Sequence, residues 1–249
     1  IDAACQDIAA KSEKDLKAYA DLDPASRGSK KLVLQSYKCF KAVLLYRVAH
    51  HIIQMEDSDE HRIIAREISE YAKVLSGGEI HPAAKIGVPF VIDHGYGTVI
   101  GETASIGNNC YFLNNITLGA RSIANNPTTK RHPTIGHNVQ IGASVSIYGN
   151  ITIGDNCFIA PYTTVTRNIK EGTKVSCNFR FQEMHFTSSN AKILGVFPEI
   201  ADGKIVLRGK NLVFSNAECF IETSKGVEEP LTILKNTKKK LVLNFKERY

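Results

Sequence analysis

The sequence lacks the features that mark several broad classes of protein. It has no run of about 18 apolar residues, so a membrane-spanning helix is not expected. Its first residues contain no basic segment followed by an apolar one, so they do not form a secretory signal pattern, although a chain that begins at Ile1 leaves an upstream leader open. A dense basic stripe with aromatic neighbours, typical of nucleic-acid binding, is also missing. We therefore expect neither a membrane nor a nucleic acid as a partner.

The six cysteines also lack a pairing pattern. No two of them form a CxxC motif, so in a chain of 249 residues we expect separate, mostly buried thiols of a cytoplasmic protein. Hydrophobic residues make up 43% of the chain and charged residues 22%, which is typical of a globular protein. The net charge of +6 suits an anionic small ligand, such as a coenzyme that contains a nucleotide.

Residues 1–78 are predicted to form an α-helical domain. Apolar residues at helical spacing run through Lys31–Gln54 and again through Asp59–Leu75. A pair of glycines follows the second segment and is a typical helix stop. The Asp-Pro-Ala-Ser sequence that begins at Asp23 predicts a turn before the first segment.

The centre of the chain repeats every six residues. Three series of aliphatic or aromatic residues carry this repeat, separated by an insertion of two residues and by a longer loop. The series are Ile80, Ile86, Ile92; Ile100, Ile106, Phe112, Leu118; and Ile135, Ile141, Ile147, Ile153, Ile159, Val165. An α-helix repeats every 3.6 residues and a strand every two, so neither explains the pattern. A triangular solenoid does, because three short strands with corners complete a coil and stacked coils bury one apolar column.

We therefore predict a mostly β chain with three regions: the α-helical domain, a parallel β-helix over residues 79–170 and a small β-rich extension over residues 171–249. A polar loop at residues 120–133 interrupts the repeat, and loops that project from a solenoid commonly carry function. Short strands separated by turn residues are predicted in the extension. They are Lys204–Arg208, Leu212–Phe214, Cys219–Glu222, Leu231–Leu234 and Leu241–Phe245.

One histidine of the repeat is placed to act as a base. His94 follows Asp93 at a corner and precedes a Gly-Tyr-Gly sequence. Imidazole takes up a proton near neutral pH, and to activate a hydroxyl group it needs a carboxylate that fixes its tautomer. Glu79 and Glu102 are both candidates, and Glu79 precedes His94 by fifteen residues, close to the eighteen of one coil. On spacing alone, a surface histidine at a corner fits equally well.

The motifs of the repeat resemble those of the serine acetyltransferases. The matching segments are IHPAAKIG from Ile80, IDHGYGTVIGETASIG from Ile92, ITLGA from Ile116, RHPTIG from Arg131 and IGASVSIYGNITIG from Ile141. The resemblance covers about residues 79–170 and extends more weakly to the LDPASRG and YRVAHHI segments upstream. Sugar acetyltransferases share the hexads but not the combination of DH…GET and RHP. The resemblance implies a left-handed β-helix and transfer of an acetyl group from acetyl-CoA to the hydroxyl group of L-serine, in cysteine biosynthesis.

The resemblance also implies roles for individual residues. His94 would be the general base, and Glu79, which stands where the family has an aspartate, would orient it. The implied substrate-binding residues are Asp23 and Asp93 for the amino group of serine and Arg131 and His132 for its carboxylate. A guanidinium fork suits that last role. Transfer in the family is direct, so no cysteine nucleophile is required.

Several positions depart from the family pattern where acceptor and coenzyme bind. The implied coenzyme-binding residues are Ala120, Ala143 and Ser144, and two of them, Ala120 and Ser144, stand in place of glycines. Lys130 replaces the aspartate before the RHP motif, and Tyr96 places a bulky ring beside the base. Acetyl-CoA is expected as co-substrate and no metal is expected. Another acceptor, such as homoserine, an amino sugar or another small alcohol, would keep the same chemistry and stays open.

A homotrimer is expected, because the family site lies between neighbouring prisms. A dimer of trimers stays open, since the helical domain is shorter than in the family. The family's short tail that ends in Ile and docks into a partner sulfhydrylase is absent from a chain that ends at Tyr249, so that partner is not expected.

Two further classes stay open. The γ-class carbonic anhydrases are also trimeric left-handed β-helices and hold zinc with three histidines, two of them in an HxxxxH spacing. His132 and His137 have that spacing, and His94 could supply the third ligand. A scaffold without catalytic activity, acting in assembly through its β extension, is the other alternative.

Overall fold

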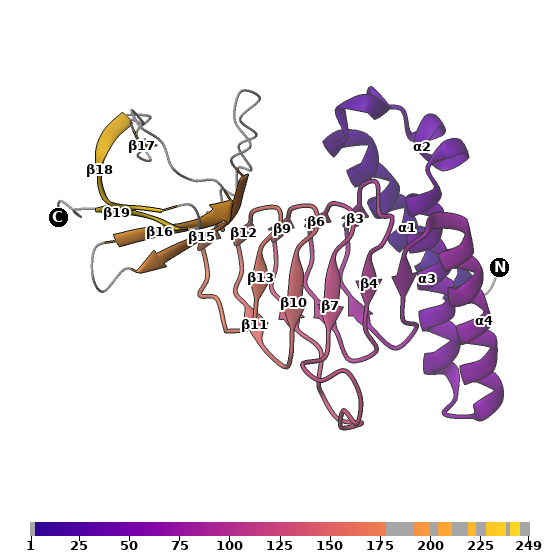
Figure 1. Cartoon of the computed structure of the whole chain (residues 1–249). Coiled ribbons are helices and arrows are strands. Elements are labelled where there is room, and N and C mark those ends of the chain that lie inside the picture. Colours follow the sequence, from indigo (N-terminus) through magenta and orange to yellow (C-terminus); the bar gives the residue numbers. More distant parts are fainter. Residues whose placement is uncertain are drawn as a thin grey trace. The chain divides into compact units, whose positions relative to one another are not determined.

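The structure, a computed structural model, describes residues 3–177, 192–199, 204–210, 219–222, 228–237 and 240–244. The chain divides into two compact units, residues 1–178 and residues 179–249. The first unit contains the helices and the β-helix, and the second contains an antiparallel sheet (Figure 1). Among the residues described, no helix combines the length and the apolar character needed to cross a membrane.

The helical region consists of α1 (Ala3–Leu22), the short 3₁₀ helix η1 (Pro24–Ser26), α2 (Lys30–Ser36), α3 (Lys38–Met55) and α4 (Asp59–Ser76). Serine side chains begin two of these helices: Ser29 accepts a hydrogen bond from the backbone of α2, and Ser58 does the same for α4. Gly77, at φ 74°, ends α4 as the sequence predicts. The predicted helix over residues 31–54 is in fact two helices, because Tyr37 between α2 and α3 has extended backbone angles.

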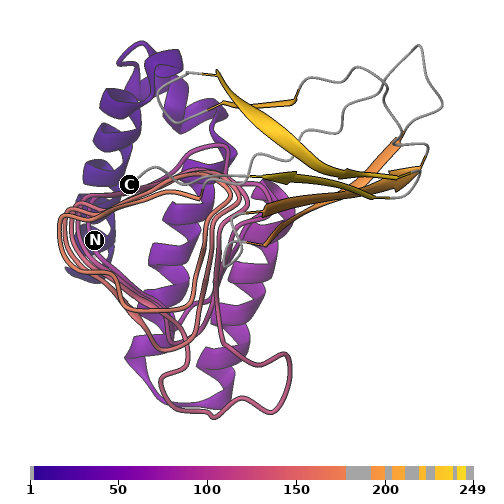
Figure 2. The same cartoon turned by 60° about the vertical axis from the view of Figure 1, so that its left-hand side comes forward.

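Three parallel sheets form the faces of the β-helix, and every strand is two or three residues long. Face 1 contains β1 (Glu79–Ile80), β4 (Val99–Ile100), β7 (Thr117–Gly119), β10 (Ser146–Tyr148) and β13 (Thr164–Val165). Face 2 contains β2 (Lys85–Ile86), β5 (Ser105–Ile106), β8 (Thr134–Ile135) and β11 (Thr152–Ile153). Face 3 contains β3 (Phe90–Ile92), β6 (Cys110–Phe112), β9 (Gln140–Ile141), β12 (Phe158–Ile159) and β14 (Lys174–Val175). Figure 2 shows the coils stacked in register and the loop between β7 and β8 projecting from them.

The predicted hexad residues form the core of this prism. Each hexad residue lies directly opposite its equivalent in the next coil, as Ile80 does with Ile100, and all of them are buried. The column inside face 1, for example, is Ile80, Ile100, Leu118, Ile147 and Val165. Burial of stacked aliphatic side chains in this way stabilises every coil only through its neighbours.

The helices close the first coil of the prism by satisfying its free backbone groups. The hydroxyl of Tyr19 bonds both the N–H and the carbonyl of Ile92, and Ser69 donates to the carbonyl of Ile80. A buried ion pair adds to this cap: the Arg47 guanidinium bonds Asp15 and also donates to the carbonyl groups of Ile86 and Gly87 at the end of β2. An unpaired strand edge is thereby covered and joined to the helical region.

The second unit is a five-stranded antiparallel sheet in the order β15–β16–β19–β18–β17. Its strands are β15 (Lys192–Glu199), β16 (Lys204–Lys210), β17 (Cys219–Glu222), β18 (Glu228–Asn236) and β19 (Lys240–Asn244). Four of the five predicted strands overlap these, whereas the predicted strand Leu212–Phe214 lies outside the described residues and β15 was not predicted. Leu241 and Leu243 form its small apolar core.

The five described cysteines are all free thiols. Cys110 and Cys157 are buried in the β-helix, Cys39 is half-buried, and Cys5 and Cys177 are exposed. The expectation of mostly buried thiols therefore holds only within the β-helix.

Candidate active site at two corners of the β-helix

The predicted site residues lie at two different corners of the prism, one on each side of face 1. Asp93 and His94 form the turn from β3 to β4, where face 3 meets face 1; we call this the His94 corner. Glu102 follows β4, and Arg131 and His132 precede β8, where face 1 meets face 2; we call this the Arg131 corner.

His94 has an unusual backbone conformation. Its φ of 60° lies in the left-handed region, which residues other than glycine, asparagine and aspartate adopt rarely. Asn115 and Ser144 have the same conformation at this corner in the following coils, so the turn itself requires it. Tyr162 also has this conformation in a later coil, so the conformation alone does not distinguish His94. Its side chain is 77% exposed, and Nε2 lies 3.6 Å from Oδ2 of Asp93.

Two tyrosines hold the predicted amine-binding carboxylates. The hydroxyl of Tyr111, on β6, donates to Oδ2 of Asp93 over 2.9 Å, and the hydroxyl of Tyr37 donates to Oδ2 of Asp23. The bond to Asp23 raises the pKa of Tyr37 to about 12, and Asp93 contributes to that rise. Burial, followed by the bond to Asp93, raises the pKa of Tyr111 well above its usual value. Asp23, from the helical region, therefore joins the His94 corner.

Sequence reasoning missed both tyrosines. The only available signal for Tyr37 is its position in a segment that otherwise has helical spacing, and Tyr111 occupies an outward position of the hexad, where spacing carries no information.

Glu79 lies on β1 and is held by cations of α4. Its two carboxylate oxygens accept bonds from Arg66 over 2.9 Å and from Lys73 over 2.7 Å. Partial burial alone would raise the pKa of Glu79, but these two cations lower it below its usual range. Glu79 pairs with Val99, twenty residues further along, so the first coil is longer than eighteen residues. Within the part of the chain that the structure describes, the ionic partner of His94 is Asp93 and not Glu79.

At the Arg131 corner, the residues of the GET motif pack against and bond those of the RHP motif. Gly101 leaves room for the ring of His132, since a Cβ atom there would lie 2.2 Å from that ring. The carboxylate of Glu102 forms an ion pair with the guanidinium of Arg131. Partial burial opposes ionisation of Glu102, but Arg131 nevertheless holds the pKa of that carboxyl below its usual value. The two motifs, about thirty residues apart in sequence, are thus one structure.

Thr103 is the residue of this corner that sequence reasoning missed. Its Oγ1 accepts hydrogen bonds from the backbone N–H groups of Arg131 and His132, each over 3.0 Å, and lies 2.9 Å from Nδ1 of His132. His132 is buried, with 8% of its surface exposed. The GET run was the available signal, because its threonine follows the glutamate directly.

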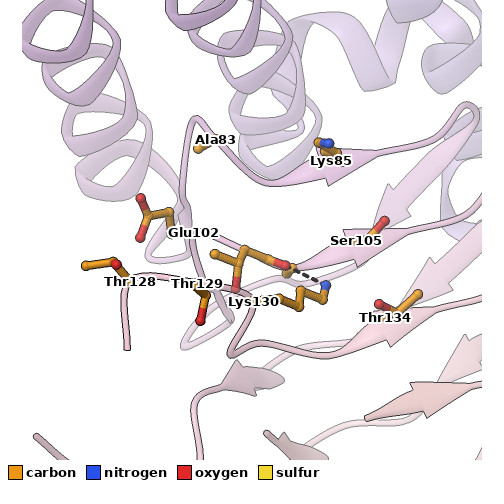
Figure 3. A pocket seen from close by; sticks show the side chains of 10 residues that line it. Ala83, Lys85, Glu102, Ser105, Thr128, Thr129, Lys130 and Thr134 are labelled. Carbon is orange, nitrogen blue, oxygen red and sulfur yellow. Dashed lines mark hydrogen bonds between the residues drawn. The ribbon is translucent and has the colours of Figure 1, made fainter. Parts of the chain in front are cut away.

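A pocket of ≈ 490 Å³ lies under the projecting loop, beside the Arg131 corner (Figure 3). Lys85, Ser105 and Thr134 line it from neighbouring strands of face 2, and Thr128 and Lys130 line it from the loop. The Nζ atom of Lys130 donates to the carbonyl of Thr103 over 2.6 Å. The pocket therefore offers hydroxyl groups and two cations to an anionic ligand.

The predicted coenzyme-binding residues are divided between the two corners. Ala120 follows β7, at the start of the projecting loop, whereas Ala143 and Ser144 lie below the His94 corner, after β9. The hydroxyl of Ser144 accepts a bond from Asn115 over 3.1 Å.

The three histidines of the zinc alternative lie at three different corners of one chain. His94 lies between faces 3 and 1, His132 between faces 1 and 2, and His137 between faces 2 and 3. No group of three potential metal ligands occurs among the residues for which the structure gives positions.

Comparison with known proteins agrees with this architecture. The sequence model of the bacterial transferase hexapeptide (six repeats) family matches residues 132–167. A serine acetyltransferase of Bacillus licheniformis is 37% identical over 163 residues, which are 66% of this chain and 72% of that protein. One from Synechococcus elongatus is 38% identical over 155 residues, 62% of this chain and 60% of that protein. The crystal structure of Neisseria gonorrhoeae serine acetyltransferase in complex with serine has a TM-score of 0.62 and 35% identity, covering 70% of this chain and 68% of that one.

The fold and these matches define a transferase of the hexapeptide-repeat class, built on a left-handed parallel β-helix with N-terminal helices and a C-terminal β extension. Within that class, the chain belongs to the serine acetyltransferase family. The fold and the family predicted from the sequence are both confirmed. The chain spans 60% of the length of the Synechococcus relative.

Proposed function

We propose that this chain transfers an acetyl group from acetyl-CoA to the hydroxyl group of L-serine and so forms O-acetylserine. The observation that carries this proposal is the distribution of charge on the two sides of face 1. One corner presents the carboxylates of Asp23 and Asp93 beside His94, and the other presents Arg131 and His132. An amino acid has an ammonium group for the first corner and a carboxylate for the second. The relative solved with serine supports this acceptor.

The site would be formed between two chains. The six residues from Gly97 to Glu102 that join the corners span on the order of 16 Å, which a serine molecule cannot bridge. We therefore propose a homotrimer in which the His94 corner of one chain faces the Arg131 corner of its neighbour. Glu79 lies on face 1 between the two corners, opposite Val99, and would then orient His94 of the neighbouring chain.

Direct transfer gives each group a defined step. A ring nitrogen of His94 removes the hydroxyl proton of serine as the oxygen attacks the thioester carbonyl carbon. The carbon–sulfur bond then breaks, and the imidazolium returns the proton to the departing CoA thiolate. Carboxylates at the site, Asp93 among them, stabilise the imidazolium while it exists. The exposure of His94 leaves its ring nitrogens accessible to a second chain and to substrate.

The coenzyme would use the pocket beneath the projecting loop. Lys85 and Lys130 offer positive charge to its phosphate groups, and the threonine and serine hydroxyls offer hydrogen bonds. Ala120 at the start of the loop and Ala143 with Ser144 of the facing chain would line its path towards His94. The small side chains at these positions leave space for a thioester arm.

The test is an assay of thiol release from acetyl-CoA by the purified full-length chain, with L-serine, homoserine, an amino sugar and water as acceptors. We expect release that depends on serine. Release with homoserine or the amino sugar alone would keep the chemistry and replace the acceptor. Silence with every acceptor, in protein that is folded and oligomeric, would contradict the proposal and favour a scaffold; a zinc analysis of the same sample would then decide the carbonic-anhydrase alternative.

A further inference from the structure

The hydrogen bonds of Thr103 determine where its hydroxyl proton goes. The hydroxyl oxygen has two lone pairs, and the backbone N–H groups of Arg131 and His132 donate to it, each over 3.0 Å. With both lone pairs occupied, the hydroxyl can only donate to its third neighbour, Nδ1 of His132 at 2.9 Å. Thr103 is therefore the donor in that contact and His132 is the acceptor.

A second donor points at the same nitrogen. The backbone N–H of Thr103 donates to Nδ1 of His132 over 3.1 Å. A nitrogen that accepts two hydrogen bonds carries no proton, so the neutral ring has its proton on Nε2. Within the described part of the chain, Nε2 of His132 has no hydrogen-bond partner. It is nevertheless not a buried unpaired atom, because the buried side-chain atom without a partner there is Ser12 Oγ. The Nε2–H group is therefore in contact with solvent and free to donate.

We propose that Thr103 is a positioning residue that fixes His132 as the neutral Nε2–H tautomer, so that His132 donates an uncharged hydrogen bond to the acceptor carboxylate. The identity of that carboxylate rests on the proposed function, whereas the tautomer rests on the hydrogen bonds alone. Arg131 then supplies the positive charge at this end of the site, and the hydrogen bond from His132 orients the carboxylate.

The surroundings of His132 act in the same sense. Burial lowers the pKa of His132, and the positive charge of Arg131 lowers it further; Lys130 and His81 add to this, while Glu102 opposes it. Protonation would also require Nδ1 to give up both of its accepted bonds. The ring is therefore expected to stay neutral as the pH falls through the range near 6.5 in which an unperturbed histidine becomes charged.

The first test reads the tautomer directly. The chain is labelled with ¹⁵N-histidine, and long-range ¹H–¹⁵N spectra are recorded from pH 5.5 to 8, with a His132→Gln variant to assign the signals. We expect Nδ1 of His132 to have the shift of an unprotonated nitrogen across this range. A protonated Nδ1, or a ring that becomes charged near pH 6.5, would overturn the proposal.

The second test removes the hydroxyl. Thr103→Val keeps the shape of the side chain and removes both the donor to Nδ1 of His132 and the acceptor of the two backbone N–H groups, and Thr103→Ser is the matched control that keeps both. In Thr103→Val we expect the titration midpoint of His132 to move up towards 6.5 and the KM for serine to rise several-fold with little change in kcat, whereas Thr103→Ser should behave like the parent chain. Unchanged midpoint and tautomer in a folded Thr103→Val variant would show a merely structural threonine and contradict the proposal.

The two proposals fail separately. A parent chain that does not acetylate serine overturns the proposed function, yet the spectra still decide the tautomer. If Thr103→Val does not fold, as judged by its thermal unfolding, the spectra of the parent chain remain decisive.

Discussion

The two corners beside face 1 differ in how firmly their side chains are held. At the Arg131 corner, Glu102 pairs with the guanidinium group, and Thr103 anchors both the backbone and the ring of His132. At the other corner, His94 is 77% exposed and lies 3.6 Å from Asp93, its ionic partner among the described residues. Several bonds within the chain hold the side chains of the Arg131 corner, whereas His94 has one ionic contact among the described residues.

We relate this difference to the proposed roles of the two corners, carboxylate binding at the Arg131 corner and catalysis at the His94 corner. Groups that hold a carboxylate gain from rigidity, because their orientation is fixed before the ligand arrives. A base must instead contact a hydroxyl group, a thioester and an orienting carboxylate, and the exposure of His94 leaves it accessible to such groups. The following variants, ordered from the largest expected effect to the smallest, would break or sharpen this comparison.

Removal of the base should have the largest effect. We expect His94→Ala to lower kcat for acetyl transfer by about 10²–10⁴-fold, because a positioned general base contributes that much. The measurement is thiol release at saturating serine and acetyl-CoA. His94→Asn is the matched control for the backbone, since asparagine adopts the left-handed conformation that Asn115 has at the same corner. Full activity in either variant would exclude His94 as the base.

Loss of the guanidinium should mainly affect acceptor binding. A hydrogen bond to a charged group contributes about 1.5–3 kcal/mol, so we expect Arg131→Ala to raise the KM for serine by about 10–100-fold. The KM for acetyl-CoA should change much less. Arg62→Ala, which removes an arginine that pairs with Asp57 and Asp59 on the helical surface, is the control. An unchanged KM for serine would contradict the assignment of this corner to the carboxylate.

Mixed oligomers would show whether the two corners of a site come from different chains. His94→Ala and Arg131→Ala chains with different tags are co-expressed, and oligomers that carry both tags are isolated. Each variant retains one intact corner, so one of the three interfaces in every hybrid trimer should have two intact corners. Activity should therefore rise well above that of either parent. Hybrids no more active than their parents would place both corners of a site in one chain.

The sequence predicts the prism far better than the site. Hexad residues such as Ile80 and Ile100 define the columns, because their burial requires a strict period of six residues. That period is visible in a single sequence. His132, the partner of Thr103, lies 29 residues away across a loop, so no local sequence pattern predicts this contact. The carboxylate of Glu79 is likewise held by α4 cations, which no strand periodicity can indicate.

The helical region shows the same limit. Helical spacing correctly marks Asp59–Leu75, but the break at Tyr37 arises from tertiary structure, since its hydroxyl bonds Asp23 from the preceding turn. Helix propensity alone does not predict a helix end at an aromatic residue that fits the helical pattern.

The smallest effect should come from the tyrosines that hold the carboxylates of the His94 corner. Tyr111→Phe removes a hydrogen bond that positions Asp93 but does not itself contact serine, so only part of the about 1.5–3 kcal/mol of a bond to a charged group should be lost from serine binding. We therefore expect the KM for serine to rise by about 2–10-fold. The kcat should change little, because the ring and the base stay in place. Steady-state kinetics with serine as the varied substrate measures both.

Tyr162→Phe is the control, since Tyr162 is exposed and lies at the equivalent corner of a later coil. A rise confined to Tyr111→Phe would mean that even the looser corner has prearranged binding groups and that only its base awaits a partner. Equal behaviour of the two variants would mean that Asp93 is positioned by its backbone alone, and the contrast between the corners would then extend to every side chain of the His94 corner.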